Sequence, residues 1–524
     1  MLGILFRFYD LSILPSGLHV DEVKVGWNAY SLFKTGRDDW WHAFPLHYDT
    51  FGDQRPTGLF YASVPSLALN GLTVFAIRFT PALFGSLAVI AIFYITKKLT
   101  GSNKVAICTS LMLAISPWHI TLSRATSEGI VATTLILFAW LYQLKNIESG
   151  SRSHFLTSAT LYAVSYFFYH TSRLLIPAFI FATTAYYFFN SVPKKINLAS
   201  IFLFILASAL TVILSLSPAA RGRLSQVSIF ADQGIRTELD RLPFEEGHNR
   251  VFLARALHNK VVIFSTRFFN EYTQYFSGKF FLTAEEAKPS RYQTATRGIL
   301  LYVEFVLLVV GLVGLAQKKF SYLPLLLLLL APLPAAITTE DAPNLHRSLV
   351  MSPFISLIAG FGLYQLSRFS RKILILTVFI LAVDLFLFSH LYMVHNPARD
   401  SLTLPRNVGA VELIVSVQKH SQKYSRIYLT NRPDHLYPWY VFQTGQDPKI
   451  FNPQLSAKKS QDWTYGNIIF SQYRCPSGFI QDQKLKNVLA VDAEGCPPPA
   501  RLKLVENITR PSGGITYSIW EPKD

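Results

Sequence analysis

The sequence predicts a mainly α-helical protein that crosses a membrane many times. Half of its 524 residues are hydrophobic and only 15% are charged, whereas about a quarter of the residues in soluble domains are charged. Mean hydropathy is +0.28, and apolar runs long enough to cross the hydrocarbon core recur along the chain. The aromatic content of 14% suits a protein with many rings at the two membrane surfaces.

Ten apolar runs, uncharged or nearly so, are expected to span the bilayer. They are residues 79–96, 105–123, 129–144, 155–172, 174–192, 196–218, 298–317, 320–339, 348–367 and 373–395. Residues 1–9 are apolar but too short to span, so we expect the tail of a truncated first helix and a bundle of about eleven helices. Residues 57–74 are interrupted by Pro65 and Gly71, which favours interfacial helices in the first external loop.

Basic residues in alternate short loops predict the orientation. They are Lys97, Lys98, Lys104, Lys145, Arg152, Lys194, Lys195, Lys318, Lys319, Arg368, Arg371 and Lys372. The positive-inside rule places these loops in the cytoplasm and leaves loop 10–57, insert 218–297 and segment 396–524 outside. This pattern accounts for the net charge of +17. Some of these basic residues would also meet anionic lipid head groups. No nucleic-acid motif accompanies it.

Two domains are predicted, a transmembrane domain over residues 1–395 and a small extracytoplasmic α/β domain over residues 396–524. The second shows a helical pattern over 411–419 and short apolar runs at 426–430, 467–470 and 487–491. Cys475 and Cys496 lie in it and are able to pair in an oxidising compartment. The expected location is the plasma (inner) membrane.

An acidic pair, Asp21-Glu22, begins the first external loop and is the leading candidate for catalysis. If this stretch is helical, Asp21, Lys24 and Asn28 share one face. A carboxylate there is able to accept a proton from an incoming hydroxyl group. The alternative is a solvated helix start, since acids favour the first turn of a helix, and the spacing alone leaves both readings open.

Other polar residues on the same side are candidate ligands. Arg55 follows Asp53 in a turn bounded by glycine and proline, and the guanidinium fork suits phosphate. Arg124 and Glu128, four residues apart, form either a helical ion pair or part of a cleft. His346 and Arg347 precede a span, where arginine either grips a phosphate or reaches toward the membrane surface.

Two acids lie within expected spans, where ionisable groups are functional candidates by default. Glu304 lies near the outer end of its span, which favours a structural or head-group role. Asp384 lies deeper, and the sequence indicates no partner for it.

Several of these motifs, taken in order, resemble a known superfamily. They are Asp21-Glu22 and the segments 28–36, 51–56, 78–85, 115–119 and 123–124. Together they resemble the C-type membrane glycosyltransferases, in particular the protein O-mannosyltransferase, aminoarabinose transferase and RgtA/B/C/D-like groups. The resemblance covers residues 1–395 and is specific over residues 18–128.

The resemblance implies transfer of a sugar from a polyprenyl-phosphate donor on the non-cytoplasmic face, with inversion. The acceptor would be a hydroxyl group of a protein, lipid or polysaccharide. The catalytic acid of the family maps onto Asp21 and its neighbour onto Glu22. The Glu-Lys-Pro turn of the aminoarabinose transferase reads Gln54-Arg55-Pro56 here, so Arg55 would take over the phosphate contact while the acid is lacking.

Arg124 and Arg347 match cationic positions of the family, and the other candidates come from the sequence itself. Arg124, Arg347 and His346 would complete the phosphate site, and Lys24, Asn28, Asp53 and Glu128 are possible substrate ligands. We expect no cofactor and no obligatory metal, because arginines would hold the leaving phosphate. The alternatives are a transporter or flippase for lipid-linked sugars, whose spans would carry more polar residues at mid-membrane, and an inactive scaffold for envelope assembly.

Overall fold

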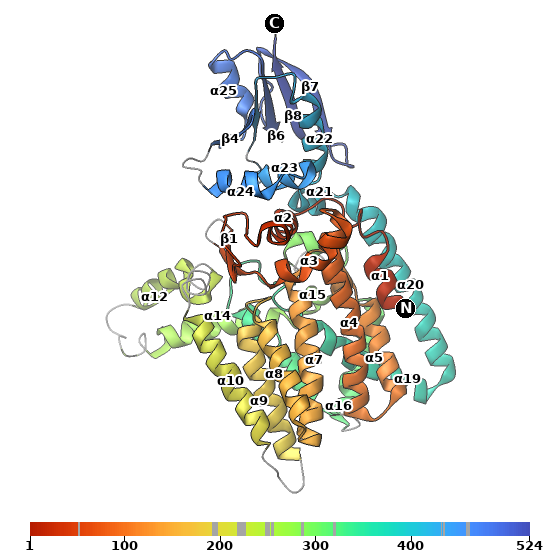
Figure 1. The fold of residues 1–524 in the computed structure, drawn as a ribbon. Coiled ribbons are helices and arrows are strands. Elements are labelled where there is room, and N and C mark those ends of the chain that lie inside the picture. The colour runs from red at the N-terminus through yellow and green to blue at the C-terminus, as the bar shows by residue number, and fades with distance from the viewer. Residues whose placement is uncertain are drawn as a thin grey trace.

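The computed structural model describes residues 1–50, 53–190, 197–216, 227–246, 252, 256–283, 288–317, 321–430, 432, 435–456 and 462–523. A helical bundle forms one end of the molecule, and a smaller α/β part that holds the C-terminus forms the other (Figure 1). The mainly helical fold class predicted from the sequence is confirmed.

The bundle consists of helices that match the predicted apolar runs. They are α4 (Val74–Thr100), α5 (Asn103–Ile115), α6 (Pro117–Arg124), α7 (Glu128–Ser149), α8 (Arg152–Ser165), α9 (Ser172–Asn190), α10 (Leu198–Ser215), α16 (Tyr302–Ala316), α17 (Leu323–Leu330), α18 (Leu333–Ala336), α19 (Met351–Phe369) and α20 (Arg371–His390). The short helix α1 (Leu2–Phe8) packs beside α4 and α5.

Among the described residues, five helices are long and apolar enough to cross a membrane. They are α4, α7, α9, α10 and the stretch Arg371–Ala398 that begins with α20, and the bent pair of α5 and α6 passes as a sixth. The other predicted spans correspond to α8, α16, α17 with α18, and α19, which are shorter or less apolar.

Run 105–123 is not one straight helix, because the chain bends by 54° between α5 and α6. Pro117 at the start of α6 lacks an N–H and disfavours a helical Ser116. The freed Trp118 backbone N–H donates to the Ile299 carbonyl at 3.1 Å. The bend thus ties α6 to the chain that leads into α16.

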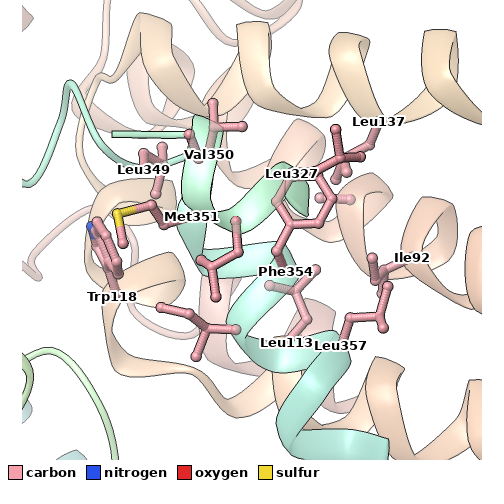
Figure 2. Close-up of a cluster of buried hydrophobic side chains, with 14 of the residues drawn as sticks. Ile92, Leu113, Trp118, Leu137, Leu327, Leu349, Val350, Met351, Phe354 and Leu357 are labelled. Carbon is pink, nitrogen blue, oxygen red and sulfur yellow. The ribbon is translucent and has the colours of Figure 1, made fainter. Parts of the chain in front are cut away.

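The bundle core is dense around α19. Trp118, Leu137, Leu327 and Phe354 converge there from four helices (Figure 2). Glycines let α16 and α19 approach closely, as small residues do between membrane helices. A Cβ on Gly311 would lie 2.1 Å from the Ile358 carbonyl oxygen, so no larger residue fits at this crossing.

The two acids in the apolar helices have structural surroundings. Asp384 forms a buried ion pair with Arg297, and its Oδ2 accepts a hydrogen bond from the Val303 N–H at 3.1 Å. It thereby caps the first turn of α16. Glu304 is fully buried and accepts a hydrogen bond from the Ser356 hydroxyl at 3.3 Å. Both side chains join helices within the bundle core.

The loop before the bundle folds over its outer end. It contains α2 (Val20–Thr35), a hairpin of β1 (His47–Thr50) with β2 (Asp53–Pro56), and α3 (Gly58–Asn70). Insert 218–297 contributes η1 (Ile229–Ala231), α12 (Gln233–Glu245), α14 (Lys260–Gln274), α15 (Gly278–Leu282) and η3 (Ser290–Tyr292). Helices α12 and α14 stand to one side of the bundle (Figure 1).

The C-terminal part is built on a six-stranded mixed sheet with the order β4-β5-β3-β6-β8-β7. The strands are β3 (Arg426–Leu429), β4 (Trp463–Tyr465), β5 (Ile468–Phe470), β6 (Val488–Ala493), β7 (Leu502–Thr509) and β8 (Ile515–Pro522). Its helices are α21 (Asp400–Thr403), α22 (Ala410–His420), α23 (Tyr437–Thr444), α24 (Pro448–Ser456) and α25 (Pro476–Asp482). Cys475 and Cys496 form a disulfide.

Helix α2 shares one hydrophobic core with the C-terminal part. Trp27 is fully buried against Phe451, and its indole N–H donates to Asn452 at 3.0 Å. The Asn452 amide in turn donates to the Ser31 hydroxyl at 2.8 Å. The sheet domain therefore holds the loop that carries the acidic pair.

Candidate active site

A cavity of about 390 Å³ opens where the first external loop meets the outer ends of the bundle helices. Its wall comes from the start of α2, strand β2, the starts of α7 and α9, and segments 289–292 and 334–347. The charged and imidazole side chains that line it are Asp21, Arg55, Glu128, His170, Arg173, Arg291, Glu340, Asp341, His346 and Arg347.

Asp21 lies in the first turn of α2 and faces the cavity. Its Oδ2 atom is 3.0 Å from Arg55 Nη1, 3.3 Å from His19 Nδ1 and 3.4 Å from Arg291 Nη2. Burial disfavours the charge, but Arg55, His19 and Arg291 together hold the pKa of Asp21 well below its ordinary value. The carboxylate is therefore ionised and beside two guanidinium groups.

Glu22 is turned away from the cavity, which corrects the expectation of a paired catalytic acid. Its carboxylate is 3% exposed and lies 3.2 Å from Arg78 and 3.0 Å from Arg406. It also accepts a hydrogen bond from the Thr126 N–H at 3.0 Å. Burial opposes the charge, but Arg406 and Arg78 lower the pKa of Glu22 to about 2. Glu22 joins α2 to α4 and to the C-terminal part.

Glu22→Gln is expected to destabilise the fold by about 3 kcal/mol at pH 7, because it leaves two buried guanidinium groups without their carboxylate. Since folding lowers the pKa, the contribution of Glu22 is present above about pH 4.5 and is lost as the pH falls toward 2. Thermal unfolding of the detergent-solubilised protein measures the change. In Glu494→Gln, which removes an exposed partner of Arg510, the loss should stay below about 1 kcal/mol. Equal losses in the two variants would contradict the buried role.

Arg124 does not reach the cavity either, which corrects its expected role as a phosphate ligand. Its guanidinium is fully buried and donates to the carbonyls of Phe6 at 2.9 Å, Tyr9 at 2.6 Å and Leu14 at 3.1 Å. These carbonyls include the end of α1, where a positive charge is favourable. Of the two residues, only Glu128 lines the cavity.

Lys24 and Asn28 lie on the side of α2 that faces the C-terminal part. The Lys24 ammonium stands 5.8 Å from the centre of the Tyr437 ring. The Asn28 amide donates to the Lys24 carbonyl at 3.0 Å and accepts from the Asp39 N–H at 2.8 Å. The helical face predicted for Asp21, Lys24 and Asn28 exists, but only Asp21 lines the cavity. The side chain of Asp53 lies outside the described residues.

His346, Arg347 and Glu128 do line the cavity. Arg347 donates to Thr338 Oγ1 at 2.9 Å and pairs with Glu340. His346 Nε2 accepts a hydrogen bond from the Gly129 N–H at 3.1 Å and lies 3.7 Å from Glu128.

His346 is a neutral ring, so any contact it makes with phosphate is a hydrogen bond without a positive charge. Burial, together with the charges of Arg291 and Arg55, lowers the pKa of His346 to about 3, so the ring is neutral. Its Nε2 is occupied as an acceptor, which leaves the Nδ1–H as the donor of this ring.

Two arginines in the wall were not identified from the sequence. Arg291 comes from η3 in insert 218–297, and Arg173 from the start of α9, where it donates to the Leu214 carbonyl at 3.4 Å. Their predicted position on the external side of the membrane was the only available signal. Among the described residues, no group of three or more His, Cys, Asp and Glu side chains is placed to hold a metal ion.

Comparison with known proteins shows what parts of the chain are similar to. Residues 54–218 match the family model of dolichyl-phosphate-mannose-protein mannosyltransferase. No curated protein sequence matches the chain. The fold is similar to that of ArnT from Cupriavidus metallidurans bound to undecaprenyl phosphate, with a TM-score of 0.54 and 12% identity over 99% of this chain and 96% of that one.

A weaker likeness links the chain to the archaeal oligosaccharyltransferase AglB from Archaeoglobus fulgidus in complex with an inhibitory peptide and a dolichol-phosphate. The TM-score is 0.48 at 12% identity, over 94% of this chain and 68% of that one. The resemblance predicted from the sequence is confirmed at the level of the fold, which is similar to that of ArnT, and of residues 54–218, which match the mannosyltransferase family model.

Proposed function

We propose that this protein transfers a sugar from a polyprenyl-monophosphate donor to an acceptor hydroxyl group, with inversion at the anomeric carbon. The observation that carries the proposal is one cavity in which the Asp21 carboxylate lies beside Arg55 and Arg291, with Arg173 and Arg347 elsewhere in the wall. The similar ArnT structure was solved with undecaprenyl phosphate, which supports a donor of this chemical class.

The chemistry balances with the residues at hand. The acceptor oxygen forms a bond to the anomeric carbon while its proton passes to Asp21. The bond between the anomeric carbon and the phosphate oxygen breaks, and its electron pair leaves with the phosphate. The phosphodiester anion thereby becomes a monoester dianion. Arg55 and Arg291 would stabilise this extra negative charge, as hydrogen-bond donors placed near a developing charge do in a transition state.

The lipid part of the donor has a path to the cavity. Leu174 of α9 and Ser215 of α10 belong to the cavity wall. Further along, α10 exposes Ile205, Val212 and Ile213 at its surface. In a membrane this face meets acyl chains, so a prenyl chain would lie along α10 with its phosphate at the arginines.

The proposed location of the site is the non-cytoplasmic face of the plasma membrane. The positive charges of the alternate short loops support this orientation. The disulfide between Cys475 and Cys496 supports it independently, because disulfides persist in oxidising compartments. The acceptor would then be an envelope component: a protein, a lipid or a polysaccharide.

A donor screen tests the function. Membranes that contain the protein are incubated, with and without EDTA, with hexose and pentose sugars on polyprenyl monophosphate, and release of polyprenyl phosphate is followed by mass spectrometry. We expect release from one donor and none from the matching diphosphate donor. Release should persist in EDTA, because guanidinium groups would neutralise the leaving phosphate. No release from any monophosphate donor would contradict the function, and loss of release in EDTA would contradict a metal-independent reaction.

A further inference from the structure

Three side chains contact the same carboxylate oxygen of Asp21, which weakens this residue as a general base. Arg55, His19 and Arg291 all approach the Oδ2 atom, within 3.0 to 3.4 Å. These side chains come from three separate elements: the β1–β2 hairpin, the start of α2 and η3. A carboxylate so paired is a poor proton acceptor, since a base works best when its pKa lies near the operating pH.

His19 determines how this cluster is held together. Arginine carries only donors, so the 2.7 Å contact between Arg291 Nη1 and His19 Nε2 makes Nε2 an acceptor. The proton of the neutral ring then sits on Nδ1, facing Asp21 Oδ2 at 3.3 Å. The Asp21 backbone N–H also lies 3.1 Å from Nδ1, which would accept it in the other tautomer. In either tautomer one ring nitrogen lies beside Arg291 and the other beside Asp21. His19 therefore bridges Arg291 and the carboxylate.

Both guanidinium groups also face the cavity, where a donor phosphate would seek the same hydrogen bonds. Side chains of Arg55 and Arg291 are 27% and 20% exposed, so they are open to a ligand, while Asp21 is 14% exposed. A phosphate oxygen and the Asp21 carboxylate are both anions that bind these donors. When the two arginines donate their hydrogen bonds to the phosphate, they bind the Asp21 carboxylate less strongly.

We propose that Asp21 is the resident counter-ion of the phosphate site, positioned by His19, and that the donor phosphate frees it by taking over Arg55 and Arg291. The inference rests on the proposed function. It makes proton acceptance conditional on donor binding, because the base gains strength only after the two arginines have turned to the phosphate. His19 is then a positioning residue that keeps the freed carboxylate directed at the cavity.

Three more titratable side chains act on Asp21 electrostatically: Glu128 from α7, Tyr292 from η3 and His346 from the segment before α19. None of them lies within ion-pair distance of Asp21 among the described contacts. Donor binding leaves the effect of these three side chains on the pKa of Asp21 in place. The change in that pKa on donor binding is therefore assigned to Arg55 and Arg291.

Affinity for the lipid phosphate is the first test. The full-length protein in nanodiscs is titrated with undecaprenyl phosphate, as wild type and as Asp21→Asn. The asparagine no longer competes for the arginines, so the variant should bind about five- to tenfold more tightly. Glu494→Gln removes one negative charge in the C-terminal part and should bind as the wild type does. Unchanged or weaker binding by Asp21→Asn would overturn the inference.

The same titration separates this inference from the function itself. If the wild type binds undecaprenyl phosphate and Asp21→Asn binds no better, only the competition is wrong. If the wild type does not bind at all, the proposed function fails. Thermal unfolding of each variant without added undecaprenyl phosphate shows whether the fold is intact.

The pH dependence of sugar transfer is the second test. The acidic limb of kcat/KM reports the free enzyme, and the acidic limb of kcat reports the donor complex. Because donor binding would free Asp21 and raise its pKa, the limb of kcat should lie at higher pH. In Arg291→Gln the two limbs should move together, because one of the two arginines no longer holds Asp21. His19→Ala should lower kcat with little change in donor KM, and His19→Gln, whose amide both donates and accepts, should restore part of it. Coincident limbs in the wild type would overturn the inference.

Discussion

Asp21→Asn is expected to reduce sugar transfer at least about 100-fold, the size of effect usual for loss of a general base. Asparagine has nearly the shape of aspartate, but it carries no charge to hold the surrounding arginines and does not take up the acceptor proton. The loss should therefore appear in kcat. The measurement is the initial rate of polyprenyl phosphate release from the donor identified in the screen.

The matched control for Asp21→Asn is Glu22→Gln, which removes the neighbouring acid. Glu22 lies outside the cavity and contacts Arg78 and Arg406 instead. At a temperature where both variants remain folded, Glu22→Gln should keep most of the rate. A large loss in Glu22→Gln with a small one in Asp21→Asn would reverse the assignment of the base.

Arg55→Gln and Arg291→Gln are each expected to lower kcat/KM for the donor about 100- to 1,000-fold, as removal of one transition-state hydrogen-bond donor does elsewhere. The reason is the second negative charge that the phosphate gains as it leaves. Because both groups act on one phosphate, the double variant should lose less than the product of the single losses. Initial rates over a range of donor concentrations give these values.

Arg510→Gln provides the control for the two arginine variants. It removes a guanidinium group of the C-terminal part that pairs with Asp400 and Glu494, away from the cavity wall. Its kcat/KM should stay within about twofold of the wild type at a temperature where the variant remains folded, since Arg510 does not line the cavity. Equal losses in all three variants would indicate a general effect of charge.

The sequence could predict the bundle and part of the cavity because both follow from composition along the chain. Apolar runs mark the helices, and alternating loop charges place Asp21, Arg55 and Arg347 on one side of the membrane. The structure brings these three residues to one cavity. A shared side of the membrane brings polar groups to one surface but does not tell which of them meet.

The failures have a common physical cause, the direction of the side chain. Successive residues on a helix point roughly 100° apart, so Asp21 faces the cavity while Glu22 faces Arg78 and Arg406. Partners that are distant in sequence were equally out of reach. Arg291 meets Asp21 across 270 residues, and no local pattern encodes that distance.

The core that α2 shares with the C-terminal sheet has a consequence for how such a protein can change. Asp21, the proposed base, sits on a helix whose opposite side contacts Asn452 and Phe451 through Trp27. A chimera that exchanged only the catalytic loop with a distant relative would bring an ill-fitting surface to this junction. The loop and the sheet domain would therefore have to change together during evolution. The proposed reaction would in this way limit how far the sequence of the sheet domain can diverge.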